Sequence, residues 1–306
     1  MKYTTAQKQS LIHRYRAGES ATAICLQSGI PRSTFYNHIL RNKRENKSYQ
    51  FRRAQLSEQI MEVYNGSNQI FGARKIKAVL GTQGIATSDR MVAELMSEMN
   101  ITSIRNGAKK NHMRFSAEKK KDHLKLHFEA EAPNAVWVSD TTYFKAKGKA
   151  YYICAILDLY SRKVIAHRVS TKHGAHLIGS IFKDAFKVRE PKGGLTFHSD
   201  RGTQYAAHSF QKLLKDCGVT QSFSPSGSPH HNAVMESFFA SLKREELYRL
   251  EYHSVQEMKE RLEKYIKFYN TERPHTTLGN RTPEAWECLF SEGISPFGKP
   301  DRGFDS

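Results

Sequence analysis

Three carboxylates, Asp140, Asp200 and Glu236, have the residue types and the spacing to hold metal ions, and 35 residues separate the second from the third. Their segments read Trp137-Val138-Ser139-Asp140-Thr141-Thr142, Phe197-His198-Ser199-Asp200-Arg201-Gly202 and Asn232-Ala233-Val234-Met235-Glu236-Ser237-Phe238-Phe239. Carboxylates at strand ends and on a helix can hold two divalent cations side by side. Such a pair activates an attacking oxygen and stabilises a leaving oxygen at one phosphodiester. The pattern therefore indicates an enzyme that cuts and joins DNA.

Most of the 30 acidic residues must be ordinary solvated surface charges, and that reading has to be weighed for these three. Asp140 follows the apolar run 135–138, and Asp200 follows the short apolar run 195–197 and precedes a turn. An unpaired carboxylate there is costly, and a metal ion or an arginine is the usual remedy. A metal explains all three residues together. Asp158 is the chief competing carboxylate, and we expect it to pair with Arg162.

Several segments resemble the retroviral-integrase-like DDE superfamily, above all bacterial insertion-sequence transposases of the copy-out–paste-in group. They are Trp137–Thr142, His198–Tyr205, Asn232–Leu247 and the C-terminal run Tyr265-Ile266-Lys267-Phe268-Tyr269-Asn270-Thr271-Glu272-Arg273-Pro274-His275, with Leu278-Gly279 and Thr282-Pro283-Glu284 after it. The resemblance covers roughly residues 46–290. It implies a ribonuclease-H-like core and a transposase and integrase activity, that is, a polynucleotidyl transferase and endonuclease.

The resemblance also implies a reaction in two steps. The first frees a 3′-OH at the element end, and the second uses that 3′-OH to attack near the opposite end on the same strand, which gives a bridged and then a circular intermediate. We expect two Mg²⁺ ions as cofactors, with Mn²⁺ as a substitute, because few carboxylates without His or Cys suit Mg²⁺. Asp140 is expected to bridge both ions, and Asp200 and Glu236 to flank one each.

Two other functions remain open on the sequence alone. One is a helix-turn-helix DNA-binding regulator whose catalytic core has decayed, and the other is a ribonuclease-H-like nuclease without strand transfer. The intact triad argues against the first. Two amino-terminal DNA-binding units argue against the second, since a nuclease has less need of them.

The charge of the chain indicates a polyanionic partner, which we expect to be double-stranded DNA in the form of element ends and target. The net charge is +18, and residues 1–130 carry 23 Lys and Arg against 10 Asp and Glu. Four separated cysteines form no metal-ligand spacing, and no apolar run approaches a membrane span. We therefore expect a soluble protein of the bacterial cytoplasm, associated with the nucleoid, that has no membrane partner.

Residues 1–45 are predicted to form a helix-turn-helix DNA-binding domain of three short helices. Thr4 or Thr5 and then Ser20 can cap the first two helices, and Pro31 suits the first turn of the third. Ile24, Cys25 and Leu26 are expected to point inward. The side chains expected to contact DNA are Arg32, Ser33, Thr34 and Asn37 from the third helix, followed by Arg41, Lys43 and Arg44. An ordinary three-helix bundle with a solvated polar face is the alternative.

Residues 46–110 are predicted to form a second helical DNA-binding unit, with Arg74 as a DNA contact and Thr87 or Ser88 as a helix cap. A basic linker is expected over 111–131. Lys109 and Lys110 stand at its start, and this region either lies along phosphates or is a solvated charge run.

Residues 132–290 are predicted to be the α/β ribonuclease-H-like catalytic core, with a mixed five-stranded sheet and a C-terminal helix, and 291–306 a tail. Strands are expected over 136–144, 150–158 and 163–169 as an antiparallel meander, then helices near 175–188 and 208–216 alternating with the strand before Asp200 and one at 219–223. The longest later helix is expected over about 255–270. His198 and His230 are expected to pack or bond rather than act.

Lys243 lies seven residues after Glu236, almost two helical turns, so the two side chains are expected to share a helix face. A cation there can meet the phosphate that the metals hold. The alternative is a surface lysine paired with Glu245 or Glu246. We also expect a homo-oligomer, a dimer or larger, on DNA, since one triad acts on one phosphodiester at a time whereas the inferred reaction joins two ends.

Overall fold

A computed structural model of the chain describes residues 4–39, 47–104, 130–146, 148–224 and 232–294. Two compact units divide the chain, Met1–Glu62 and Val63–Ser306. Within the described residues, no helix is long and apolar enough to cross a membrane.

Three short helices make up the first unit up to residue 39. They are α1 (Thr5–Arg16), α2 (Ala21–Ser28) and α3 (Arg32–Thr34), which continues as a π-helical turn, η1 (Phe35–Ile39); the long helix α4 (Lys47–Gly66) follows. Thr4 caps α1 through a capping box with Gln7, and Ser20 caps α2. The expected caps are therefore confirmed.

The core of this helical unit gathers Leu11, Ile24 and Phe35. The expectation that Leu26 points inward was wrong, since its side chain is 79% exposed. Leu26 lies two residues after the buried Ile24, about 200° around the helix at 3.6 residues per turn, and therefore faces the opposite side.

Two further helices, α5 (Ala73–Thr82) and α6 (Asp89–Glu98), open the second unit. Ser88, rather than Thr87, caps α6 by accepting a hydrogen bond from the Met91 N–H. The buried residues on these helices are Ile76, Leu80, Val92, Leu95 and Met96.

A mixed five-stranded sheet forms the centre of the second unit, in the order β3-β2-β1-β4-β5. The strands are β1 (Val136–Ala146), β2 (Lys149–Asp158), β3 (Val164–Ser170), β4 (Thr196–Ser199) and β5 (Thr220–Phe223). The first three pair antiparallel, and β1 with β4 and β4 with β5 pair parallel. The predicted meander and mixed sheet are confirmed.

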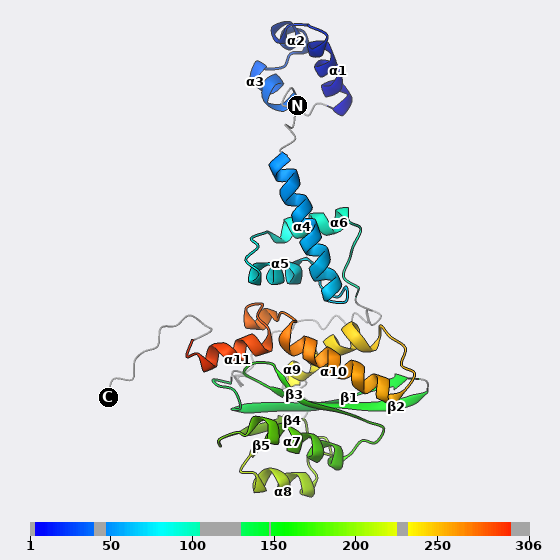
Figure 1. Ribbon diagram of the computed structural model, residues 1–306, viewed down its shortest axis with the longest axis vertical. Coiled ribbons are helices and arrows are strands. Elements are labelled where there is room, and N and C mark those ends of the chain that lie inside the picture. Colours follow the sequence, from blue (N-terminus) through cyan, green and yellow to red (C-terminus); the bar gives the residue numbers. More distant parts are fainter. Residues whose placement is uncertain (1–3, 40–46, 105–129, 147, 225–231, 295–306) are drawn as a thin grey trace, which may run out of the picture. The chain divides into compact units, whose positions relative to one another are not determined.

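Helices cover both faces of the sheet (Figure 1). One face carries α7 (Ala175–Arg189) and α8 (His208–Asp216); the other carries α9 (Ala233–Leu242), α10 (Val255–Thr271) and α11 (Pro283–Ser291). The main core lies under α7 and α8, where Trp137, Phe182, Phe197 and Phe210 pack together. These layers confirm the predicted ribonuclease-H-like fold and hold β1 and β4 rigidly side by side.

Candidate active site at the open edge of β1

Asp140 lies inside β1, as the strand expected over 136–144 implies, and not at a strand end. The strand pairs with β2 as far as Ala146, whereas its pairing with β4 stops at Val138. From Ser139 onward, β1 therefore has no ladder partner on its β4 side within the described residues. The acidic side chain stands where this edge opens.

Asp200 follows directly after β4, the parallel neighbour of β1. Its Oδ1 accepts a hydrogen bond from the Gly202 N–H at 2.9 Å, so the carboxylate closes the turn that leaves the strand. Arg201 Nε donates to the Ser224 carbonyl at 3.1 Å, which ties the same turn to the end of β5. Because β4 lies beside β1, this turn holds Asp200 near Asp140.

Glu236 occupies the first turn of α9, the helix that packs on β1. The N-terminus of a helix favours a negative side chain, because the unpaired N–H groups there carry partial positive charge. Met235, Phe238 and Phe239 bury the apolar side of α9.

The three carboxylates influence one another electrostatically. The pKa of Asp140 is raised to about 6, mainly by burial and also by the negative charges of Asp200 and Glu236. The Thr141 N–H, at 2.7 Å, and Lys243 act in the opposite direction. The structure thus brings together the three residues that the sequence singled out, with Lys243 beside them. Among the residues that the structure describes, no three His, Cys, Asp or Glu side chains are already arranged as a metal cage. A half-buried carboxylate with like charges around it and only oxygen donors nearby nevertheless fits a hard divalent cation.

A buried polar cluster on the other face of β1, which the sequence analysis missed, supports Asp140. Ser139 Oγ lies 2.9 Å from the hydroxyl of Tyr205 and donates to the Ala155 carbonyl at 3.0 Å. Tyr205 is fully buried and comes five residues after Asp200. Its hydroxyl therefore links the turn after β4 to the residue that precedes Asp140. The alternation of side chains along a strand predicts that Ser139 faces away from Asp140, but not what it meets.

Lys243 begins a π-helical turn, η3 (Lys243–Leu247), that continues α9. Its Nζ lies 5.9 Å from the centre of the Tyr143 ring. Burial lowers the pKa of Lys243, and the negative charge of Asp140 raises it. The lysine therefore lies close enough to the site to feel Asp140.

Glu245, one of the two suggested surface partners of Lys243, is instead a buried residue with 2% exposure. It accepts from Arg273 Nε at 2.8 Å, from Arg273 Nη2 at 2.9 Å and from the Tyr265 hydroxyl at 3.0 Å. Lys75 Nζ lies 3.7 Å from it. Arg273 Nη2 also donates to Ser241 Oγ at 3.2 Å. This group, Ser241, Glu245, Tyr265 and Arg273, fastens the C-terminal end of the Glu236 helix to α10 and the residues after it.

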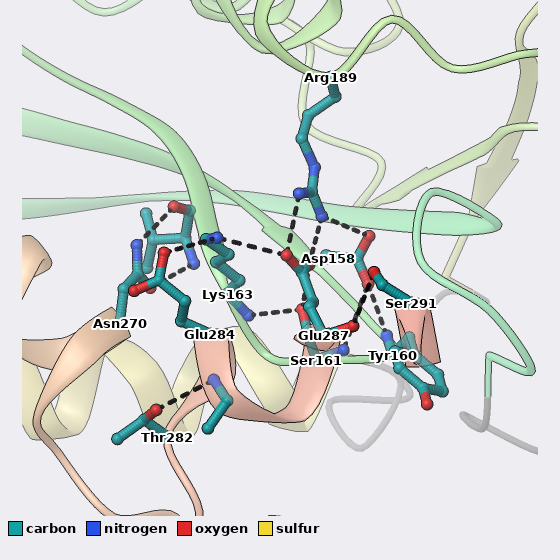
Figure 2. Close-up of polar contacts among 12 residues, drawn as sticks. Asp158, Tyr160, Ser161, Lys163, Arg189, Asn270, Thr282, Glu284, Glu287 and Ser291 are labelled. Carbon is teal, nitrogen blue, oxygen red and sulfur yellow. Dashed lines mark hydrogen bonds and ion pairs between the residues drawn. The ribbon is translucent and has the colours of Figure 1, made fainter. Parts of the chain in front are cut away.

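Asp158, the competing carboxylate, belongs to a separate structural cluster (Figure 2). It is fully buried and accepts from the N–H groups of Asn134, at 2.7 Å, and Tyr160, at 2.9 Å. Its ion-pair partner is Arg189 of α7, at 3.4 Å, and not Arg162 as expected. Arg162, in the left-handed region at φ 63°, shapes the turn after β2 and donates its N–H to the Asp158 carbonyl. Arg189 also pairs with Glu287 of α11.

The side chains predicted to contact DNA lie on several segments. Arg32, Ser33 and Asn37 are exposed on the third helix of the first unit, Thr34 is half-buried, and Arg74 is exposed on α5. Arg41, Lys43, Arg44, Lys109 and Lys110 lie outside the described residues, as does His230. His198 is buried, with its ring nitrogens 3.0 Å from Ser222 Oγ and 3.1 Å from Ser224 Oγ, which is a bonding role in the sheet.

Known families and proteins are similar to this chain in sequence. Family models described as integrase core domain match residues 130–229 and 217–283, and an HTH-like domain model matches 51–109. The putative transposase InsK of insertion sequence element IS150 from Escherichia coli K12 is 30% identical over 83% of this chain and 88% of its own length. The transposase of insertion sequence element IS904 from Lactococcus lactis is 34% identical over 78% of this chain and 95% of its own length.

A solved structure of the HTLV-2 integrase catalytic core domain in complex with magnesium is 17% identical, with a TM-score of 0.42, and covers 52% of this chain and 99% of that chain. The sequence similarity to InsK and to the IS904 transposase extends over most of this chain and over most of each relative. Together with the integrase core and HTH-like matches, they show that this chain belongs to the IS3-family insertion-sequence transposases, DDE integrase-core enzymes that cleave DNA and transfer its strands.

Proposed function

We propose that Asp140, Asp200 and Glu236 are the catalytic residues of this transposase and hold two Mg²⁺ ions, which Mn²⁺ can replace. The observation that carries the proposal is the raised pKa of Asp140, which lies at the open edge of β1 and feels both other carboxylates. In the absence of a cation, such a site is electrostatically unfavourable. Divalent ions would relieve it and make the convergence of the three charges favourable.

Bound Mg²⁺ would supply charge neutralisation at the phosphodiester and would lower the pKa of the attacking water or 3′-OH. The protein's own part is placement. β1 and β4 fix Asp140 and Asp200 at adjacent positions, α9 brings Glu236 against β1, and Lys243 offers a cation to the phosphate. No covalent protein–DNA intermediate is required, so no Tyr or Ser serves as a nucleophile.

The finer course of the reaction is also a proposal. The released 3′-OH would attack near the other end on the same strand, and the bridged product would become a circle, as in copy-out–paste-in transposition. Residues 1–45 and 46–110 would be two DNA-binding domains, 111–131 a basic linker, 132–290 the catalytic core and 291–306 a tail. Since the reaction joins two ends, the enzyme would act as a homo-oligomer on DNA.

The triad is tested by the variants Asp140→Asn, Asp200→Asn and Glu236→Gln. Each should reduce cleavage and strand transfer of element-end DNA by about a thousandfold or more, because metal charge neutralisation is lost. Binding of the same DNA should stay within about twofold. Asp216→Asn, which changes an exposed carboxylate of α8, is the matched control and should remain fully active. Activity near that of the wild type in any triad variant would remove that residue from the site.

The metal and the course of the reaction need separate measurements. Mg²⁺ or Mn²⁺ should support turnover, whereas Ca²⁺ should support assembly with little turnover because its looser geometry does not fix the reacting atoms. Gel analysis of donor DNA with two ends should show a same-strand bridged product before any circle. Full activity in excess chelator would contradict the metal-dependent mechanism. Joining only between different strands would contradict the same-strand course of the reaction.

A further inference from the structure

Aromatic side chains lie on β1 and β2 near Asp140, on the face of the sheet opposite to the one that the Asp140 side chain occupies. Tyr143 lies directly opposite Tyr152 in the antiparallel register, so both rings leave the sheet on the same face. His173, three residues after β3, stacks on Tyr152 with ring centroids 4.9 Å apart and an interplanar angle of 13°. Tyr143, Tyr152 and His173 therefore lie in one row on this face, in which Tyr152 and His173 are stacked.

The outer members of this row face solvent. Trp137 and Ser139 share the face of Tyr143 and are fully buried, and Trp137 packs against Phe182 of α7. Farther along the strand, Tyr143 is 61% exposed, and His173 is exposed as well. Tyr152 anchors the row, because it is partly buried against the main core. The core thus ends before Tyr143, and the side chains of Tyr143 and His173 are open to solvent.

Cationic side chains surround the same row. Lys243 Nζ lies 5.9 Å from the centre of the Tyr143 ring. Lys145 is exposed two residues farther along β1 on the same face, and the exposed Lys172 precedes His173. Aromatic rings interleaved with positive charge are the features that bind single-stranded nucleic acid, because bases stack on the rings while phosphates meet the cations.

We propose that Tyr143, Tyr152 and His173, with Lys145, Lys172 and Lys243, bind an unpaired stretch of the DNA strand next to the phosphodiester that the enzyme cuts. The inference rests on the proposed triad for its location. Tyr143 lies three residues, about 10 Å, along β1 from Asp140. Lys243, which feels the charge of Asp140, lies 5.9 Å from the centre of the Tyr143 ring, so the row and the site meet where the β4 side of β1 is open. The stacking contact would hold bases apart from their complements close to the reacting phosphate.

The first test measures the affinity of the full-length protein for a fluorescent oligothymidylate and for a blunt duplex of equal length, without divalent metal. Tyr143→Ala and His173→Ala should each weaken oligothymidylate binding by roughly fivefold to hundredfold, the range expected from the loss of one stacked base. Duplex binding should change by less than about twofold. Tyr143→Phe keeps the ring and should bind normally. Tyr248→Ala, which removes another exposed aromatic that contacts Phe144 on the opposite face of β1, is the control.

The second test places 2-aminopurine at successive positions beside the scissile phosphate of element-end DNA, with Glu236→Gln protein to prevent cutting. Stacking on Tyr143 should change the fluorescence at one to three adjacent positions, and the added Tyr143→Ala change should abolish that signal. Unchanged oligothymidylate affinity in Tyr143→Ala, an equal loss in Tyr143→Phe or Tyr248→Ala, or the same fluorescence with and without Tyr143 would overturn the proposal. The oligothymidylate measurement needs neither metal nor triad, so an active Asp140→Asn would refute the proposed triad and leave this result standing.

Discussion

At the scale of the residue, Asp140 makes the stability of the metal-free protein depend on pH. Its pKa is raised from 3.8 to about 6, so the folded protein binds a proton more tightly than the unfolded chain does. Stability from this group is therefore full below about pH 4 and is lost as the pH rises through 6. At 1.36 kcal/mol for each pKa unit, the loss is at most about 3 kcal/mol.

Asp140→Asn removes this charge, so in chelator the variant should be more stable than the wild type above pH 6, by at most that amount. The two proteins should converge near pH 4. Urea unfolding at a series of pH values measures both curves. A constant difference between them across this pH range would show that Asp140 does not titrate as described.

The Tyr205 hydroxyl gives a second prediction at this scale. Tyr205→Phe removes one hydrogen bond to Ser139, worth about 1 kcal/mol, and leaves the ring in the core. Because that bond links the segments of Asp140 and Asp200, we expect several-fold weaker Mg²⁺ binding, measured by thermal stabilisation during an Mg²⁺ titration. Tyr151, on β2, is also buried, and Tyr151→Phe should leave the Mg²⁺ titration unchanged. The same midpoint in Tyr205→Phe and the wild type would remove the positioning role.

The candidate carboxylates could be proposed from the sequence because each stands beside a local pattern, an apolar run or a helix start. The Tyr205–Ser139 contact could not, since it joins residues 66 positions apart through the closed fold. Asp158 illustrates the same limit. Its expected partner was the nearby Arg162, whereas the fold delivers Arg189 from the end of α7.

At the scale of the element, the end of the Glu236 helix depends on the buried ion pair between Glu245 and Arg273. Removal of one member leaves the other charge buried and unpaired, which typically costs about 3–5 kcal/mol. Arg273→Ala should therefore destabilise the protein by about 3 kcal/mol or more in urea unfolding. Arg273→Met combined with Glu245→Leu should recover much of this loss, because neither of these two charges is then left buried without the other. A double variant no more stable than Arg273→Ala would show that the packing of Arg273, and not its charge, is what matters.

The strands and helices of the catalytic core were predicted closely because apolar periodicity and turn residues mark them locally. The π-helical turns Phe35–Ile39 and Lys243–Leu247 were not predicted. A π-helical turn has the same kinds of residues as an α-helix, so the sequence does not distinguish the two. The packing around the helix decides at which position the turn takes up an additional residue. The strand expected over 136–144 already carries β1 past Asp140. The sequence did not show that the pairing with β4 stops at Val138, because only the closed fold sets that register.

At the scale of the whole molecule, the strongly basic amino-terminal part predicts where sequence recognition lies. Deletion of residues 1–45 should leave a folded protein, because the main core lies entirely within 137–219. Its preference for element-end DNA over scrambled DNA should fall by about a hundredfold or more. The slope of log affinity against log salt should also become shallower, by about one for each phosphate that the shortened protein no longer neutralises. Retained preference in the deletion would place recognition elsewhere.

The pairing of DNA ends gives a further prediction at this scale. Light scattering on the complex with element-end DNA should give a mass of at least two protomers for two ends. A complex that contains one protomer and two ends would contradict the expected homo-oligomer.

The cluster around Asp158 has a consequence for synthesis on the ribosome. Arg189 pairs with both Asp158 and Glu287. Glu287 is translated 98 residues after Arg189, so this second ion pair cannot form until then. At 5–20 residues per second, this interval lasts about 5–20 s. During that time the nascent sheet lacks α11, and the guanidinium lacks one of its two carboxylates. The contacts that tie α11 to α7 and to the end of β2 therefore form only when residue 287 of the 306 has been translated, long after the residues of the main core.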